Sequence, residues 1–127
     1  MVLLPSYSSN LQYLCSKYCF SDISIAWTIA AYDDLAATVG TNIIFTWSGS
    51  HDVQLMPDQN AFDNCDFTES EVLTFTSESS HVYTIPNTAA GDTLFFACGV
   101  RTHCSNGQKA SVFLNNLKKC DLSFKSS

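Results

Sequence analysis

Short apolar segments recur along the chain at intervals of roughly ten residues, and polar or glycine-containing turns separate them. Several segments alternate apolar and polar residues, which is the pattern of a strand with one buried face. Ile43, Phe45 and Trp47, for example, fall on one face of such a strand. No long stretch has the period of an amphipathic helix. The pattern therefore predicts an all-β sandwich of seven or eight strands.

The expected strands follow from these segments, and one helical turn is expected near residues 61–65. His51 begins one of the strands, because His51, Val53 and Leu55 alternate with other residues in the segment that follows a glycine-containing turn. The strands are expected at residues 24–29, 36–38, 41–47, 51–56, 71–76, 81–85, 93–98 and 109–115.

The chain has 127 residues, which are enough for one domain with a real core and too few for two. Residues 1–22 show no clear period, and residues 117–127 are polar and basic. We therefore expect an N-terminal extension of unknown role over residues 1–22, one domain over residues 23–116 and a C-terminal tail over residues 117–127.

The charge balance is acidic, with 12 acidic and 6 basic residues and a net charge of −6. Nucleic acids and anionic membranes are bound by clustered Lys and Arg, so the composition argues against both as partners. It favours a partner with a positive patch, which long-range electrostatic attraction would steer to this protein. No apolar run approaches the roughly 18 residues of a transmembrane segment.

Six cysteines in a chain of this size indicate an oxidising compartment. We therefore expect a protein of the secretory pathway that is extracellular or associated with the cell surface. A signal peptide is not evident in this chain, because the first residues lack a basic start and Pro5 interrupts their apolar run.

The segment between two of the expected strands carries three potential metal ligands at regular spacing. Cys98 is followed after four residues by His103, and His103 after four residues by Gln108. A thiolate, an imidazole and a weak oxygen donor suit copper if a second imidazole is supplied from elsewhere, and His51 can supply it. Taken singly, Cys98 reads as half of a disulfide, His51 as an ordinary histidine and Gln108 as an ordinary polar residue. The spacing of Cys98, His103 and Gln108 favours the metal site, and the presence of this motif favours His51 as a further ligand.

Several ordered motifs together resemble the phytocyanins, the plant branch of the blue copper (cupredoxin) proteins. The resemblance is greatest to the stellacyanins, in which the axial ligand is Gln rather than Met. It covers roughly residues 24 to 115 and implies a Greek-key cupredoxin β-sandwich. The matching segments are residues 39–45, 50–53, 62–67 and 98–109.

This resemblance implies a type 1 (blue) copper site with one copper ion that cycles between Cu⁺ and Cu²⁺. His51 and His103 are then the nitrogen ligands, Cys98 is the thiolate ligand, and Gln108 is the axial oxygen ligand. His103 is expected at the solvent-facing edge and His51 deeper in the protein. The implied function is one-electron transfer by a monomer that is not an enzyme. Its partner is a redox protein or a small-molecule electron donor or acceptor.

Cys104 follows a proposed ligand directly, and adjacent side chains on an extended chain point in opposite directions. We therefore expect Cys104 to face away from the copper and to be free to pair. The resemblance implies Cys65 as its disulfide partner. The other three cysteines are odd in number, and either Cys15 or Cys19 can pair with Cys120.

Asp52 departs from the family pattern, because cupredoxins commonly carry Asn after the first His ligand. An ionised Asp accepts hydrogen bonds but donates none. We expect this difference to affect the rigidity and the reduction potential of the site more than the identity of its metal. Two other residues with donor atoms lie outside this motif: His81 is expected to be structural or exposed, and Met56 to pack in the core or at the surface.

Three other functions remain open from the sequence. A binding or adhesion module without redox activity can use the same disulfide-stabilised fold. A storage or delivery domain for zinc or copper is possible, because zinc also accepts two His, one Cys and an oxygen. The chain could also be one domain of a multicopper oxidase, but the additional His-rich motifs of those enzymes are missing here.

Overall fold

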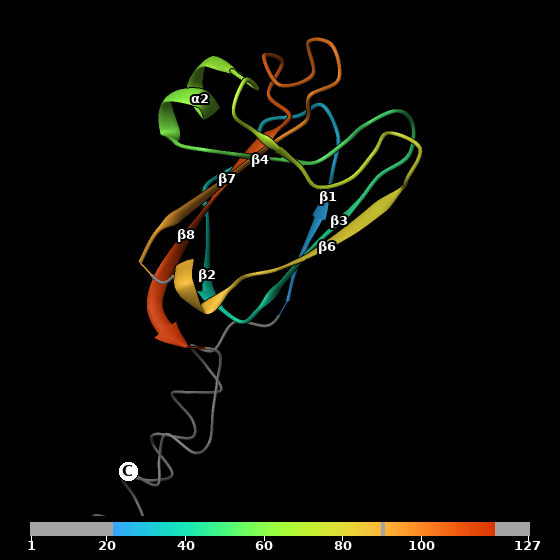
Figure 1. Cartoon of the computed structure of the whole chain (residues 1–127). Helices are drawn as coiled ribbons and strands as arrows, with labels where there is room; N and C mark the ends of the chain where they lie inside the picture. The colour runs from blue at the N-terminus through green and yellow to red at the C-terminus, as the bar shows by residue number, and fades with distance from the viewer. Residues whose placement is uncertain (1–21, 90, 119–127) are drawn as a thin grey trace, which may run out of the picture.

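The computed structural model describes residues 22–89 and 91–118. These residues form two β-sheets, one short α-helix and one 3₁₀ turn (Figure 1). The prediction of an all-β fold with seven or eight strands is confirmed. The elements are β1 (Ile23–Ala26), β2 (Leu35–Val39), β3 (Asn42–Thr46), β4 (Gln54–Met56), α2 (Gln59–Asn64), β5 (Glu71–Val72), β6 (Ser80–Thr84), η1 (Asn87–Ala89), β7 (Thr93–Ala97) and β8 (Lys109–Lys118).

The smaller sheet has the order β1-β3-β6, in which β3 pairs in parallel with β1 and antiparallel with β6. The larger sheet has the order β2-β8-β7-β4-β5. In this sheet β7 and β8 form an antiparallel hairpin, with Ala97 opposite Lys109 at the end from which the connecting loop leaves. The same end of β7 pairs with β4, where Gln54 lies opposite Ala97. The strand after His51 and the loop after Cys98 are therefore held side by side by one sheet.

The main core lies between the two sheets and is rich in aromatic residues. The rings of Trp27 and Phe45 are 5.1 Å apart, and those of Phe45 and Phe96 are 5.2 Å apart. Burial of each large side chain contributes about 1.5–3 kcal/mol to folding. As the alternating pattern predicted, Ile43, Phe45 and Trp47 are all buried.

A second cluster covers the outer face of the larger sheet beneath α2. It contains Met56, Ala61, Phe95, Ala97 and Cys104. Met56 thus has the packing role expected for it. The helix begins because the Asp58 side chain accepts the N–H of Ala61 at 2.9 Å. It lies at the same end of the molecule as the loop that joins β7 to β8 (Figure 1).

Three expected strands are shorter than the sequence pattern indicated: two end earlier, and one begins later. The first stops at Ala26, the segment 71–76 is a strand only at Glu71–Val72, and the segment 51–56 is a strand only at Gln54–Met56. The alternation inferred for the last segment is wrong, because residues 51–54 are all buried. The indole Nε1 of Trp27 donates to the Asp52 carbonyl at 2.8 Å, and Leu73 N–H donates to the Val53 carbonyl at 2.9 Å.

The last strand is longer than predicted and continues to Lys118, because it pairs in parallel with β2 as far as Val39. Most of the expected N-terminal extension and C-terminal tail, with Cys15, Cys19 and Cys120, lie outside the described residues. Within the described part, no helix is long and apolar enough to span a membrane.

Candidate metal centre

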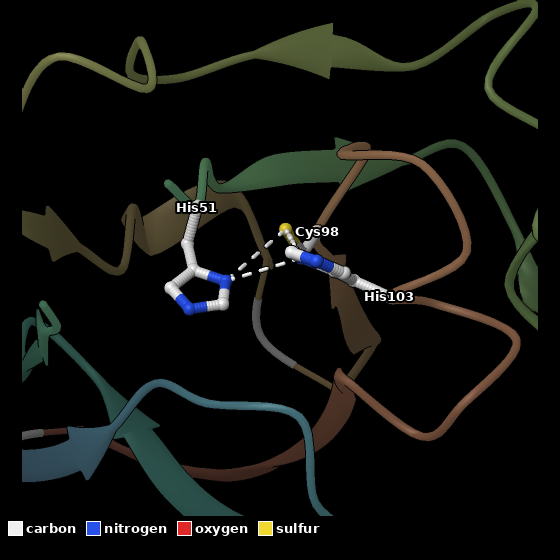
Figure 2. A group of neighbouring side chains, drawn as sticks. All are labelled: His51, Cys98 and His103. Carbon is white, nitrogen blue, oxygen red and sulfur yellow. Dashed lines mark hydrogen bonds between the residues drawn. The ribbon is translucent and has the colours of Figure 1, made fainter. Parts of the chain in front are cut away.

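Three potential metal ligands from two distant parts of the chain meet at one end of the sandwich. The Nδ1 atoms of His51 and His103 are 3.2 Å apart. The Sγ atom of Cys98 lies 3.9 Å from Nδ1 of His51 and 3.5 Å from Nδ1 of His103. Figure 2 shows both imidazoles directing a ring nitrogen towards the sulfur. Among the described residues, these three form the one group of His, Cys and acidic side chains placed to hold a metal ion.

The three distances describe a triangle that fits a single ion. A triangle with these sides has a circumscribed radius of about 2.1 Å, which is close to the bond lengths of about 2.0–2.3 Å that metals form with His nitrogen and Cys sulfur. All three angles are acute, so the centre of the circle lies inside the triangle. Two imidazoles and one thiolate around a common centre are the trigonal donor set of a copper site.

The β7–β8 hairpin positions Cys98 and His103. Cys98 N–H donates to the Gln108 carbonyl at 3.0 Å, and Gln108 N–H donates to the His103 carbonyl at 2.9 Å. His103 N–H in turn donates to the Val100 carbonyl at 2.9 Å. These bonds close the loop into tight turns, and Arg101 lies in the left-handed region with a φ of 45°. The loop is therefore fixed by its own backbone.

Gln108 is fully buried, with 0% of its surface exposed. Neither atom of its side-chain amide, Oε1 or Nε2, has a hydrogen-bond partner among the described residues. An unsatisfied buried polar group costs about 1–3 kcal/mol, so such groups are rare without a reason. The side-chain oxygen Oε1 of Gln108 is therefore available to a group that the described residues do not supply.

His51 is buried, with 9% of its surface exposed, whereas His103 is only partly buried. The expectation that His51 is the deeper of the two imidazoles is confirmed. The Cys98 side chain is completely buried and is a free thiol, which excludes the alternative that it is half of a disulfide. His81, on β6, is not part of the group.

Asp52 connects the two segments that carry the ligands. Its backbone N–H points at Cys98 Sγ at 3.5 Å. One carboxylate oxygen accepts the N–H of Gly99 at 2.6 Å, and the other accepts Nε2–H of Gln54 at 3.0 Å. Both partners are donors, so an acidic side chain satisfies this position without needing to donate. The departure from Asn at this position is thus compatible with a bridged site.

Burial sets the protonation states of the metal-free ligands. Burial raises the pKa of the Cys98 thiol, although the N–H groups of Asp52 and Val100 partly oppose the effect. Burial lowers the pKa of His103, and the nearby His51 and Arg101 lower it further. The metal-free site therefore holds a neutral thiol and a neutral His103 imidazole at neutral pH. A metal that binds the thiolate must release the Cys98 proton.

Cys104 is buried and forms a disulfide with Cys65. Both expectations for it are confirmed: its side chain packs in the second cluster, beneath α2, and its partner is Cys65. Sequence reasoning missed Gln54 and Gly99, which donate to the Asp52 carboxylate, and Ser70, which donates to Gln54. No motif marks Gln54 or Ser70, and the glycine directly after Cys98 is the one signal that could have drawn attention to this contact.

A groove of about 530 Å³ lies at the ends of β4 and β7. Apolar residues, including Leu55, Pro57 and Leu94, form part of its surface. Four carboxylates also line it, from Asp58, Glu69, Glu71 and Asp92.

Comparisons with known proteins agree with this architecture. The family model described as a plastocyanin-like domain matches residues 29–108. Cucumber stellacyanin, solved with Cu²⁺, is 22% identical, with a TM-score of 0.60 over 76% of this chain and 99% of that chain. Spinach plantacyanin is 16% identical, with a TM-score of 0.58 over 75% of this chain and 100% of that chain. Cucumber basic protein, a blue copper protein, is 24% identical, with a TM-score of 0.50 over 67% of this chain and 78% of that chain. No curated protein sequence matches the chain.

The structural likenesses confirm the expected cupredoxin β-sandwich of the phytocyanin type. The family match covers more than half of the chain and includes His51, Cys98, His103 and Gln108. The protein belongs to the plastocyanin-like domain family.

Proposed function

We propose that this protein is a type 1 (blue) copper protein that transfers single electrons. His51 and His103 bind copper through Nδ1, and Cys98 binds it through its thiolate. The observation that carries the proposal is the acute triangle of donor atoms, with sides of 3.2, 3.5 and 3.9 Å. Cucumber stellacyanin with Cu²⁺ and the blue copper protein of cucumber share the fold, which supports the choice of metal.

Gln108 supplies the axial oxygen in this proposal. Its amide is buried without a hydrogen-bond partner in the described part of the chain, and its backbone is paired with that of Cys98 across the hairpin. An amide oxygen is a harder donor than the thioether of Met. It therefore favours the oxidised ion and lowers the reduction potential relative to a site with axial Met.

Bound copper supplies the couple between Cu⁺ and Cu²⁺, and the chain supplies a donor geometry that changes little between them. The hairpin holds Cys98 and His103, while β4 follows His51 and pairs with the same strand. Burial excludes water from the Cys98 sulfur, and the Asp52 N–H points at it. Partly exposed His103 is the edge through which the electron passes. Four donors fill the site, so we propose a carrier rather than an enzyme.

An optical titration tests the proposal. Addition of one equivalent of Cu²⁺ should produce a thiolate–copper charge-transfer band in the visible, and Cys98→Ser should abolish it. His81→Ala is the matched control, because His81 lies on β6 outside the donor group, and it should keep the band. A protein that binds one Cu²⁺ and stays colourless would contradict the proposal.

Metal storage is the alternative, because two His, one Cys and an oxygen also suit zinc. Reversible oxidation and reduction at an electrode separates the two functions, since zinc has no accessible second oxidation state. A protein that prefers zinc and shows no reversible couple with copper would favour storage.

The proposed partner is a redox protein with a positive patch, or a small electron donor or acceptor. The net charge of −6 and the four carboxylates of the groove support this choice. We further propose that the protein acts as a monomer outside the cell or at its surface. The Cys65–Cys104 disulfide is compatible with that oxidising environment. Residues 23–116 are the proposed domain.

A further inference from the structure

We propose that the segment from Cys65 to Ser70 holds the metal centre in shape by fixing the residue that follows each of its three ligands. Those residues are Asp52 after His51, Gly99 after Cys98, and Cys104 after His103. Each is connected to the 65–70 segment by a covalent bond or a hydrogen-bond chain. The inference rests on the proposed function for the identity of the ligands, but the connections exist in the metal-free protein.

The first connection is covalent. Cys65, at the start of the segment, forms the disulfide with Cys104. Cys104 is buried and its neighbour His103 provides the more exposed of the two imidazoles. The disulfide therefore restricts the backbone of the ligand loop directly beside a ligand.

The second connection is a chain of hydrogen bonds from the other end of the segment. The Ser70 hydroxyl donates to Oε1 of Gln54 at 2.6 Å. Nε2 of Gln54 donates to Oδ2 of Asp52 at 3.0 Å. Because the carboxylate can only accept, the Gln54 amide has one orientation, with its oxygen towards Ser70. Gln54 is buried, so loss of either bond would leave a polar atom without water or a partner.

The third connection continues from Asp52 to the thiolate ligand. Oδ1 of Asp52 accepts the N–H of Gly99 at 2.6 Å. A side chain at position 99 would displace the Gln54 amide, because its Cβ would overlap Nε2 of Gln54. The Asp52 N–H also points at Cys98 Sγ. Gln54 and Ser70, which are not proposed ligands, thus act on Cys98 and His51 through Asp52.

The segment from Cys65 to Ser70 is itself held in place by packing and hydrogen bonds. Phe67 and Phe62 pack against the second cluster beneath α2. Asp66 N–H donates to the Ala61 carbonyl at 2.9 Å. Nζ of Lys109, the first residue of β8, donates to the Phe62 carbonyl at 2.9 Å. This bond connects α2, which directly precedes the segment, to the hairpin that carries Cys98 and His103.

Gln54→Glu and Ser70→Ala break the hydrogen-bond chain at different points. A carboxylate at position 54 faces the carboxylate of Asp52 and repels it, and Ser70→Ala leaves Oε1 of Gln54 unpaired. The matched controls are Gln59→Glu, which adds the same charge on the exposed face of α2, and Ser105→Ala, which removes an exposed hydroxyl from the ligand loop. None of the four residues is a proposed ligand.

The first measurement is hydrogen exchange at the Gly99 amide in the metal-free full chain. Loss of the bond to Asp52 should accelerate exchange about tenfold in Gln54→Glu, with a smaller acceleration in Ser70→Ala. Gln59→Glu and Ser105→Ala should not change it. Equal exchange in Gln54→Glu and Gln59→Glu would overturn the proposal. If Gln54→Glu does not fold, the same comparison between Ser70→Ala and Ser105→Ala decides.

The second measurement tests whether both ends of the segment act together. In a Cys65→Ser/Cys104→Ser background, Ser70→Ala should accelerate Gly99 exchange more than it does with the disulfide intact, because the segment then lacks both ties. Strictly additive effects would show two independent contacts and would overturn the idea of one holding segment.

The third measurement uses the copper-loaded protein. Gln54→Glu and Ser70→Ala should shift the thiolate–copper band and the reduction potential, while the two controls leave both unchanged. An unchanged band in Gln54→Glu would contradict a role at the metal centre. A wild-type protein without the band would contradict the proposed function instead, and the exchange measurements would still decide whether the segment holds the ligand loop.

Discussion

Gln108 is the residue with the least satisfied surroundings in the described structure. It directly precedes β8 and is fully buried. Neither polar atom of its side-chain amide has a hydrogen-bond partner among the described residues. Burial of such a group lowers the free energy of unfolding, and a ligand that binds the amide can restore it. The amide therefore links the stability of the metal-free protein to the proposed metal site.

Replacement of Gln108 by Leu should stabilise the metal-free protein by about 1–3 kcal/mol, because it removes the unpaired amide while keeping an apolar side chain of similar size. Urea denaturation in the presence of a chelator measures the effect. Gln59→Leu, on the exposed helix surface, is the control and should change little. A destabilised Gln108→Leu protein would mean that the amide is satisfied in the metal-free state.

The lowered pKa of His103 makes the stability of the metal-free protein depend on pH. Below the ordinary His pKa of about 6.5 the unfolded chain binds a proton that the folded protein binds less readily. The contribution of the neutral His103 imidazole to the free energy of unfolding is therefore fully present above that pH. It is lost as the pH falls through the folded-state pKa of His103. Denaturation at several pH values between about 5 and 7 measures it. His103→Gln should flatten the dependence, and an unchanged slope would contradict the assignment.

At the level of single residues, the motif spacing led to the correct prediction that three of the proposed ligands lie together. His51, Cys98 and His103 meet as expected. The role of Gln54 was not predictable, because its partners Asp52 and Ser70 meet it only through folding. Hydrogen bonds between side chains from different segments leave no periodic trace in a sequence.

Among the elements, the β7–β8 hairpin was the easiest to predict and the segment after His51 the hardest. The hairpin consists of two apolar runs whose strands pair from Thr93 to Ala97. Residues 51–53 contain the apparent alternation of a strand but are buried on all sides. A strand with one solvent-exposed face alternates apolar and polar residues, whereas a segment that is buried on both faces need not. The period alone therefore cannot distinguish a strand from a buried loop.

The disulfide between Cys65 and Cys104 joins α2 to the ligand loop. It closes a sequence separation of 39 residues, for which loop-closure entropy predicts a stabilisation of about 4 kcal/mol. Cys65→Ser/Cys104→Ser should therefore lower the free energy of unfolding of the metal-free protein by roughly that amount. Chemical denaturation without metal measures it. A loss below about 1 kcal/mol would show that the surrounding packing already restricts the loop.

At the scale of the whole molecule, the acidic charge balance and the carboxylate-lined groove are the features behind the proposal of a positively charged partner. The acidic balance could be read from composition, but the groove could not, since its four carboxylates come from three separate stretches of chain. The cupredoxin sandwich itself was predictable because its motifs recur in order. The N-terminal 21 residues carried no such pattern, and they remain outside the described structure.

Electron transfer to a basic redox protein should slow as ionic strength rises, because salt screens the attraction between the partners. Glu69→Gln/Glu71→Gln should slow it about tenfold at low salt if the groove contributes to the encounter. The control is Asp33→Asn/Asp34→Asn, which removes the same amount of charge from the segment before β2, at the opposite edge of the larger sheet. Stopped-flow kinetics compares the two. Equal slowing in both variants would assign the effect to net charge alone.

The most direct measurement of the central claim is X-ray absorption at the copper edge of the loaded protein. We expect a short coordination shell of one sulfur and two nitrogens, and the sulfur should disappear in Cys98→Ser while His81→Ala leaves the shell intact. A shell of nitrogen and oxygen alone in the wild-type protein would contradict it.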